Sequence, residues 1–226
     1  GWSLADLSQL LRGDESTLIV GHIRLPRTLG AWLTGALLGL AGAIAQGLFR
    51  NPLADPYLLG SASGASLGVV LVLASAGFAG GVLSQVGQLG LVGAAFAGSV
   101  LGVSLTLSLA RGAQHTTRLL LAGVVVGVVL SAAADLVTTV SPDALRGRQA
   151  FMLGFTCFLG WQSCALLSAG LVLTLPLAWR LSRALDALTL GEDSARSLGL
   201  ALPRIRAALV IALALATGLA VSQAGL

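Results

Sequence analysis

One long uncharged stretch constrains this sequence more than any other feature. Residues 56–110 contain no Asp, Glu, Lys, Arg or His, and a helix needs about 20 apolar residues to cross a bilayer. The stretch is therefore long enough for two spans, with a turn in its glycine-rich part at 77–88. Only 10% of all residues are charged and 56% are hydrophobic, whereas soluble domains carry roughly 25% charged residues. We expect an integral membrane protein.

Four further apolar stretches predict four more spans, and only Asp135 interrupts them with a charge. Runs such as residues 119–126 do not alternate between apolar and polar residues, as the strands of a membrane β-barrel do. The expected fold is therefore an all-α polytopic bundle of about six transmembrane helices. The chain stops inside the sixth stretch without a flanking charge, so we expect it to be a truncated piece. These four spans are expected at residues 28–49, 119–140, 149–179 (preceded by a short irregular piece) and 207–226.

The arginines orient the bundle. All thirteen basic residues are Arg, and cytoplasmic loops carry the excess of positive charge. With six alternating spans, one side has five arginines: Arg12, Arg24, Arg27, Arg146 and Arg148. The other side has eight and is the expected cytoplasmic side: Arg50, Arg111, Arg118, Arg180, Arg183, Arg196, Arg204 and Arg206. Because these residues lie between spans and not on one exposed face, they do not indicate nucleic-acid binding.

Small residues recur four positions apart, a pattern that lets helix backbones approach closely in lipid. Three pairs and one triplet predict packing seams: Gly35 and Gly39; Gly60, Gly64 and Gly68; Gly98 and Gly102; Gly123 and Gly127. The hydroxyl-rich segment 60–66 has a second interpretation, in which Ser61, Ser63 and Ser66 line a polar path. Cys157 and Cys164 are expected to be free, buried thiols, although a chain break at Gly160 would allow a disulfide.

No motif for catalysis or for a metal site is present. The chain has no Lys, so it cannot form a phosphate-binding G-x-x-x-x-G-K-[ST] loop, and it has no H-E-x-x-H, no G-x-S-x-G and no zinc-type Cys/His spacing. Asp135 is the one clear ionisable residue inside a span. It could line a pathway, or it could lie near the outer end of its helix, where it would be hydrated or paired with Arg146 or Arg148. We therefore expect no catalytic residue, metal or cofactor in this chain, and a permease driven by another subunit. A gradient-driven secondary transporter is the alternative.

Five segments in register closely resemble the iron-siderophore, haem and cobalamin permeases of bacterial ABC importers. The first is Arg24-Leu25-Pro26-Arg27-Thr28-Leu29. The second is Gln46-Gly47-Leu48-Phe49-Arg50-Asn51-Pro52-Leu53-Ala54-Asp55-Pro56, followed by Leu59-Gly60 and Gly64-Ala65. The others are Thr117-Arg118-Leu119-Leu120-Leu121-Ala122-Gly123, then Met152-Leu153-Gly154 before Trp161, then Leu190-Gly191-Glu192-Asp193-Ser194-Ala195-Arg196-Ser197-Leu198-Gly199. A lone match would mean little, but five segments in order cover essentially the whole chain.

The resemblance implies a single permease domain over residues 1–226, equivalent to the second to seventh helices of a ten-helix fold in the bacterial inner membrane. Such permeases are homodimers that work with two ATPase subunits, which bind ATP and Mg, and with a periplasmic substrate-binding protein. The implied substrate is a ferric siderophore, haem or cobalamin. The same topology places residues 1–24 in the periplasm, in agreement with the arginine count.

The resemblance also assigns roles to residues at both ends of the spans. Arg24 and Arg27 are expected to dock the binding protein through its carboxylates, with headgroup anchoring as the alternative. Four residues are expected to narrow the cytoplasmic end of the pathway: Asn51, Leu53, Thr116 and Thr117. The alternative is that their two segments are only tight connections between helices.

The resemblance implies that the charged loop 186–206 binds the ATPase, with an ordinary solvated loop as the alternative. Acids early and Arg later predict one short helix in it, and Pro203 could start a second. The coupling residues implied by the resemblance are Gly191, Glu192, Ala195, Arg196, Leu198 and Gly199.

Overall fold

The computed structural model describes residues 19–78, 87–111, 116–157, 159–191, 195, 197 and 199–226. Every long element in these ranges is a helix, as the sequence predicts. A π-helical turn η1 (Val20–Arg24) leads into the first long helix. The others follow in order: α3 (Leu25–Phe49), α4 (Ser61–Phe78), α5 (Gly87–Leu109), α6 (Thr116–Val140), α7 (Pro142–Leu153), α8 (Trp161–Thr189) and α10 (Leu202–Ala224).

Five segments of the described chain are long and apolar enough to cross a membrane: Val20–Phe49, Gly90–Leu109, Thr116–Val140, Trp161–Leu188 and Leu202–Ala224. Helix α4 supplies a shorter apolar segment over Ser61–Ser75. Together these make the six apolar helices that the sequence predicts.

The fifth predicted span has the wrong bounds. Residues 149–153 belong to α7, a separate 12-residue helix, and the span itself is α8, which starts twelve residues later than predicted. Local signals explain the difference. Ser141 caps α7 by accepting the Ala144 amide at 3.4 Å, Pro142 starts it, and Gly154 with a φ of 64° ends it.

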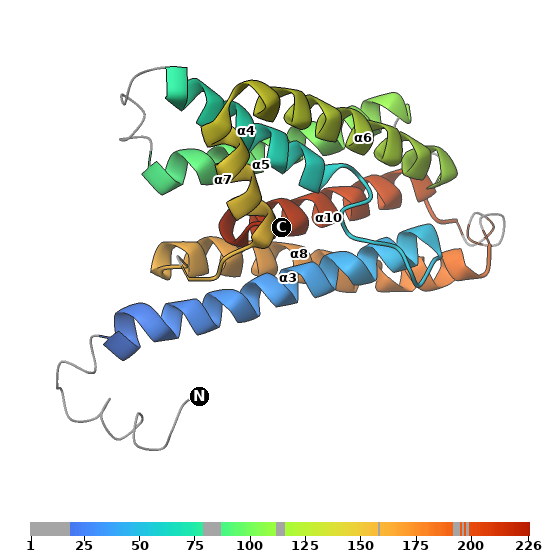
Figure 1. Ribbon diagram of the computed structural model, residues 1–226. Helices are drawn as coiled ribbons and strands as arrows, with labels where there is room; N and C mark the ends of the chain where they lie inside the picture. The colour runs from blue at the N-terminus through green and yellow to red at the C-terminus, as the bar shows by residue number, and fades with distance from the viewer. Residues whose placement is uncertain are drawn as a thin grey trace, which may run out of the picture.

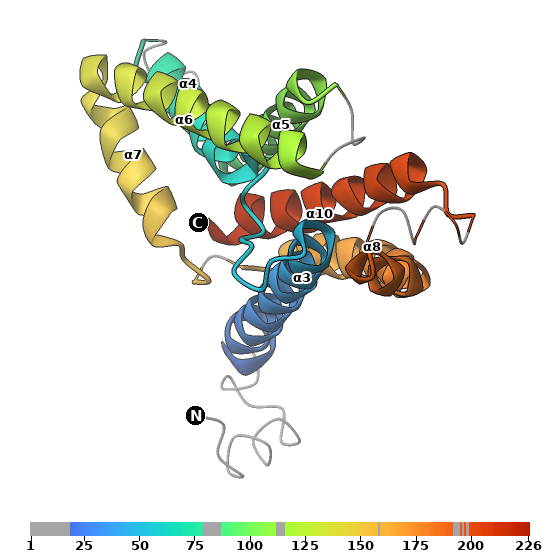
Figure 2. The ribbon, with the colours of Figure 1, turned by 90° about the vertical axis from the view of Figure 1, so that its right-hand side faces the viewer.

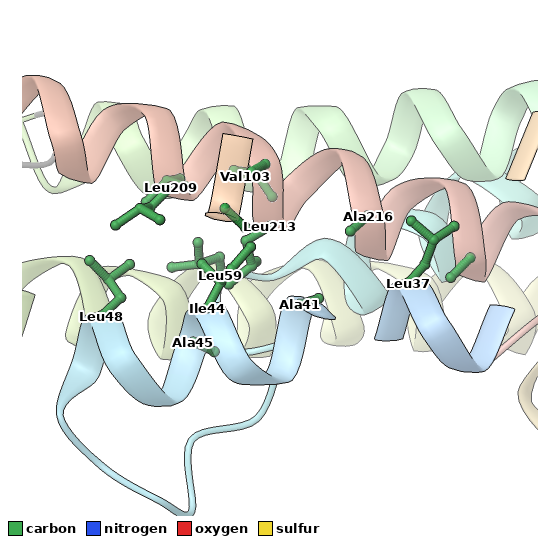
Figure 3. Close-up of a cluster of buried hydrophobic side chains, with 14 of the residues drawn as sticks. Leu37, Ala41, Ile44, Ala45, Leu48, Leu59, Val103, Leu209, Leu213 and Ala216 are labelled. Carbon is green, nitrogen blue, oxygen red and sulfur yellow. The ribbon is translucent and has the colours of Figure 1, made fainter. Parts of the chain in front are cut away.

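Helix α10 lies in the middle of the bundle. It separates the pair α3 and α8 from the group α4, α5 and α6, and α7 runs from the end of α6 toward the start of α8 (Figures 1 and 2). The main core forms where α3 meets α10 (Figure 3). Leu37, Ile44 and Leu48 of α3 and Leu209 and Leu213 of α10 are all at most 1% exposed. This contact attaches the pair α3 and α8 to the rest of the molecule.

The glycine pattern forms a close seam between α4 and α5. A side chain at Gly64 or Gly68 would run into the carbonyl oxygen of Gly98 or Ala94, and one at Gly102 would meet the carbonyl of Gly60. These positions confirm the predicted packing. In α3, Gly35 and Gly39 have no such contact within the described chain, since apart from the helix's own backbone no atom lies within 4 Å of where their Cβ would be.

The chain between α3 and α4 turns back into the bundle. Arg50, with a φ of 50°, ends α3 in the left-handed conformation. The segment then runs into the interior of the bundle, where the Leu59 side chain is fully buried. The carbonyl oxygen of Leu59 accepts a hydrogen bond from the hydroxyl of Thr106 at 2.9 Å. Gly123 of α6 permits this return, because a side chain there would collide with the Leu58 carbonyl. Helix α4 therefore begins inside the bundle.

Candidate functional site

The helices alternate in direction, so the candidate residues separate into two groups at opposite ends of the bundle (Figure 1). One end has the start of α3, the end of α6 and the start of α8, and with them Arg24, Arg27 and Asp135. The other end has the end of α3, the start of α6 and the 190–201 connection. The expected docking residues and the expected gate and coupling residues thus lie on opposite sides.

Arg24 and Arg27 project from a firmly held helix entrance. Both side chains are exposed, whereas Pro26 between them is buried. The Pro26 carbonyl accepts the thiol of Cys164 at 3.1 Å, and the Trp161 indole donates to the Gly21 carbonyl at 3.2 Å. The start of α8 therefore fixes the start of α3 and leaves both guanidinium groups free to face outward.

The expected gate residues come from two segments at the opposite end. The Asn51 side chain accepts the Leu53 amide at 2.9 Å, and its backbone carbonyl accepts the Ala54 amide at 3.0 Å. This tight turn presents the Leu53 side chain, which is 88% exposed. Thr116 and Thr117 open α6 and are half-buried and exposed, respectively.

A groove of about 480 Å³ runs between α4 and α6, and the expected pathway residues divide between its lining and the core. Ser63 and Asp135 line it, and Ser131 donates a hydrogen bond to Ser63 at 3.0 Å. Ser61 and Ser66 are 0% and 4% exposed and lie outside the lining. In the described chain, Ser63 and Asp135 therefore face the groove, whereas Ser61 lies in the core and the Ser66 hydroxyl accepts a hydrogen bond from Arg148.

Tyr57 borders the same groove from the loop between α3 and α4. Burial, and to a lesser extent the neighbouring Asp55 carboxylate, raise the pKa of the Tyr57 phenol. The hydroxyl therefore stays protonated and neutral. Together with Ser63 and Ser131, it adds hydroxyl groups to a groove whose lining is otherwise mostly apolar.

Asp135 forms an ion pair with Arg148, so one of the two pairings left open by the sequence is the correct one. Arg148 also donates from Nε to Ser66 Oγ at 3.3 Å, while Arg146 approaches Asp143 at 3.8 Å on the exposed face of α7. The Arg148 side chain is only 15% exposed. It links α7 to both α4 and α6 near the outer end of the groove.

The expected coupling loop is shorter than predicted. Helix α8 continues to Thr189 and α10 begins at Leu202, so the connection covers residues 190–201 and not 186–206. Pro203 lies in the first turn of α10 itself, so the prediction that it starts a second short helix is wrong. Ala195 and Ser197 are helical, as expected for the first one. Glu192, Arg196 and Leu198 lie outside the described residues, as do residues 1–18 of the expected periplasmic segment.

Three of the coupling positions can be placed. Gly191 and Gly199 have φ values of 110° and 77°, which side chains rarely adopt. Ala195 between them is fully buried and packs with Leu188 and Leu202. The loop is therefore anchored by its own apolar cluster at the ends of α8 and α10.

The two cysteines are free, but their surroundings differ. Cys164 is buried in α8 as expected, whereas Cys157 is exposed, which corrects the prediction of two buried thiols. Cys157 lies in the connection before α8 that the predicted span had absorbed. Within the described ranges, no three acidic, His or Cys side chains gather as a metal site would require.

Sequence reasoning missed two contacts at these sites. Ser131 precedes Asp135 by one helical turn, so its presence on the same face could have been read from the i, i+4 spacing. The hydrogen bond from Arg50 to the Leu188 carbonyl, at 3.5 Å, joins residues 138 positions apart. No local signal in the sequence indicates it.

The sequence matches the FecCD transport family over residues 2–226. The chain belongs to this family. It is 39% identical over 218 residues to the vitamin B12 import system permease protein BtuC of Pectobacterium atrosepticum, covering 94% of this chain and 62% of that protein. It is 40% identical over 212 residues to the same permease of Salmonella typhi, covering 92% and 62%. The chain therefore spans less than two thirds of the length of these relatives.

A solved structure shares the fold. It is described as an inward-facing conformation of a metal-chelate type ABC transporter, and it matches with a TM-score of 0.80 at 25% identity, covering 93% of this chain and 66% of that one. With these relatives and its apolar helices, the chain is a multi-pass protein of the bacterial inner membrane.

Proposed function

We propose that this chain belongs to the transmembrane subunit of an ATP-driven ABC importer that moves a metal chelate from the periplasm to the cytoplasm. The observation that carries the proposal is the separation of the candidate residues. Exposed Arg24 and Arg27 lie at one end of the bundle, and Leu53, Thr116 and the 190–201 connection lie at the other. An importer needs this arrangement, because it receives substrate on one side and is driven from the other.

Cobalamin is the first candidate for the substrate, since the relatives are named as vitamin B12 import permeases. Ferric siderophores and haem are the alternatives within the same chemical class, in line with the metal-chelate type neighbour. The groove between α4 and α6 offers hydroxyl groups and one paired acid. Such a surface suits a large solute that must pass without being held tightly.

The proposed partners are a second copy of the permease, two ATPase subunits that carry ATP and Mg, and a periplasmic binding protein. The arginines at the α3 entrance suit the binding protein, and the anchored 190–201 connection suits the ATPase. We assign no catalysis to this chain, because the relatives are named as permeases and energy coupling belongs to the ATPase. Residues such as Leu121, Val129 and Leu136, which lie outside the groove lining, make α6 an exposed apolar face for lipid or for the second copy.

The test is uptake by the complete permease, reconstituted in proteoliposomes with its ATPase and binding protein. Radiolabelled cyanocobalamin should accumulate with ATP and not with a non-hydrolysable analogue. An excess of haem or of a ferric siderophore should leave the uptake unchanged if cobalamin is the substrate. Uptake that a proton or sodium gradient drives without the ATPase would instead establish a secondary transporter.

A further inference from the structure

The C-terminal ends of α3 and α8 lie against each other at the end of the bundle assigned to the cytoplasm (Figure 1). Gly47, in the last turn of α3, permits this approach. A Cβ on Gly47 would lie 3.2 Å from both δ-methyl groups of Leu185 in α8. Leu185 also packs against both the main core and the apolar cluster of Leu188, Ala195 and Leu202. The contact therefore joins the core to the 190–201 connection.

Arg50 spans the gap between the two helix ends. Its Nη1 donates to the carbonyl oxygen of Leu188 at 3.5 Å, and the same oxygen accepts the amide of Gly191 at 3.1 Å. The last carbonyls of a helix lack partners within the helix and carry partial negative charge, so a guanidinium group is favourable there. Arg50 lies at the end of its own helix α3 as well, and one cation thus faces two helix C-termini.

The two sides of this hydrogen bond belong to different functional segments. Arg50 directly precedes Asn51, whose amide bonds back to the Gln46 carbonyl at 3.1 Å and whose side chain holds the Leu53 amide. These hydrogen bonds attach the turn from Arg50 to Leu53 to the end of α3. On the other side, Leu188 shares its cluster with Ala195, in the segment expected to contact the ATPase.

We propose that Arg50 is a positioning residue through which the end of α8, with Gly191 and Ala195 of the connection that follows it, sets the position of the turn that presents Leu53. This inference rests on the proposed importer function. When the ATPase displaces the 190–201 connection, the Arg50 guanidinium carries the end of α3 and its turn with the end of α8. Without that hydrogen bond, the ATPase cycle continues but moves the gate less completely.

The first experiment measures the coupling of transport to ATP hydrolysis in the reconstituted full complex. Arg50→Ala removes the hydrogen bond to Leu188 and should lower the number of substrate molecules taken up per ATP about fivefold, while ATP hydrolysis persists. Arg50→Met keeps the aliphatic stem and should act in the same way, so the test remains available if the alanine variant assembles poorly. Arg50→Lys should restore part of the coupling, because its ammonium group can donate to the same carbonyl.

Arg183→Ala is the matched control. It removes an exposed guanidinium from α8 near the same end and should leave the coupling ratio at the wild-type value. Wild-type coupling in both Arg50→Ala and Arg50→Met would overturn the inference. A wild-type complex without ATP-dependent uptake would instead contradict the proposed function, so the two failures are distinguishable.

The second experiment reports on the turn itself. In a Cys157→Ser background, a Leu53→Cys probe is labelled with a membrane-impermeant maleimide in inside-out vesicles, with and without ATP and vanadate. Nucleotide should change the labelling rate when Arg50 is present, and this change should be lost in Arg50→Met. A purely structural role of Arg50 would alter assembly and not the nucleotide response, so an unchanged response would overturn the proposal.

Discussion

The carbonyl oxygen of Gly64 occupies the place that a side chain on residue 98 would need, and the carbonyl of Gly98 occupies the corresponding place for residue 64. This reciprocal contact brings the backbones of α4 and α5 together. In lipid there is no hydrophobic force between helices, so close packing of this kind is a main source of helix association. Helix α4 also begins inside the bundle and lines the groove, which makes this seam part of the candidate site.

Gly98→Ala should destabilise the folded protein by about 1–3 kcal/mol, the usual cost of overpacking a close contact. The measurement is the thermal unfolding of the detergent-solubilised protein, followed by fluorescence-detected size exclusion. Gly35→Ala is the control, because nothing in the described chain lies within 4 Å of the added methyl group. Equal unfolding temperatures for the two variants would contradict the seam.

Breaking the Asp135–Arg148 pair should loosen α7. Because the Asp135 side chain is 65% exposed, we expect an effect of only about 0.5–1 kcal/mol for Asp135→Asn. Hydrogen exchange of the amides in Pro142–Leu153 should become faster in Asp135→Asn, whereas Arg146→Ala, which removes a solvent-exposed contact, should not change it. In a double-mutant cycle, Asp135→Asn with Arg148→Ala should destabilise the protein by less than the sum of the two single effects, although Arg148→Ala also removes the hydrogen bond to Ser66. Fully additive effects would mean that the two residues do not interact.

Reversing both arginines at the α3 entrance should weaken binding of the substrate-loaded periplasmic protein. Arg24→Glu with Arg27→Glu adds like-charge repulsion to the loss of attraction, so affinity should fall about tenfold or more while basal ATP hydrolysis is retained. Wild-type affinity should also decrease as salt rises, since exposed charges are screened. If the arginines only anchor the helix, expression or stability of the variant falls and the salt dependence of binding stays the same.

Bulky residues at the start of α6 should slow transport. Thr116→Trp with Thr117→Trp fills the expected constriction, so uptake should fall several-fold while the amount of ATPase that co-purifies stays constant. Thr116→Ser with Thr117→Ser retains small hydroxyl side chains and should transport at the wild-type rate. Unchanged uptake in the tryptophan variant would remove these residues from the gate.

The contact of Arg50 with Leu188 illustrates why part of the candidate site could not be predicted. Motifs identified the loops around both residues, since each loop has its own signature in the sequence. Their juxtaposition depends on how α3 and α8 pack, and Gly47 and Leu185 fix that packing through shape. The apolar pattern around Cys157 predicts one long helix that would bury it. Ser141 and Gly154 instead begin and end the separate helix α7, so Cys157 lies in the exposed connection before α8.

The sequence by itself determined the membrane class, the number of apolar helices and the sides on which the arginines lie. These properties follow from the solvation of single segments, because an uncharged stretch of sufficient length has the same preference in any fold. Only the tertiary structure decided that Asp135 pairs with Arg148, that Ser63 faces the groove while Ser61 and Ser66 are buried, and that Arg50 reaches α8. Those outcomes depend on which helix faces meet, and the meeting is governed by backbone contacts between segments far apart in the chain.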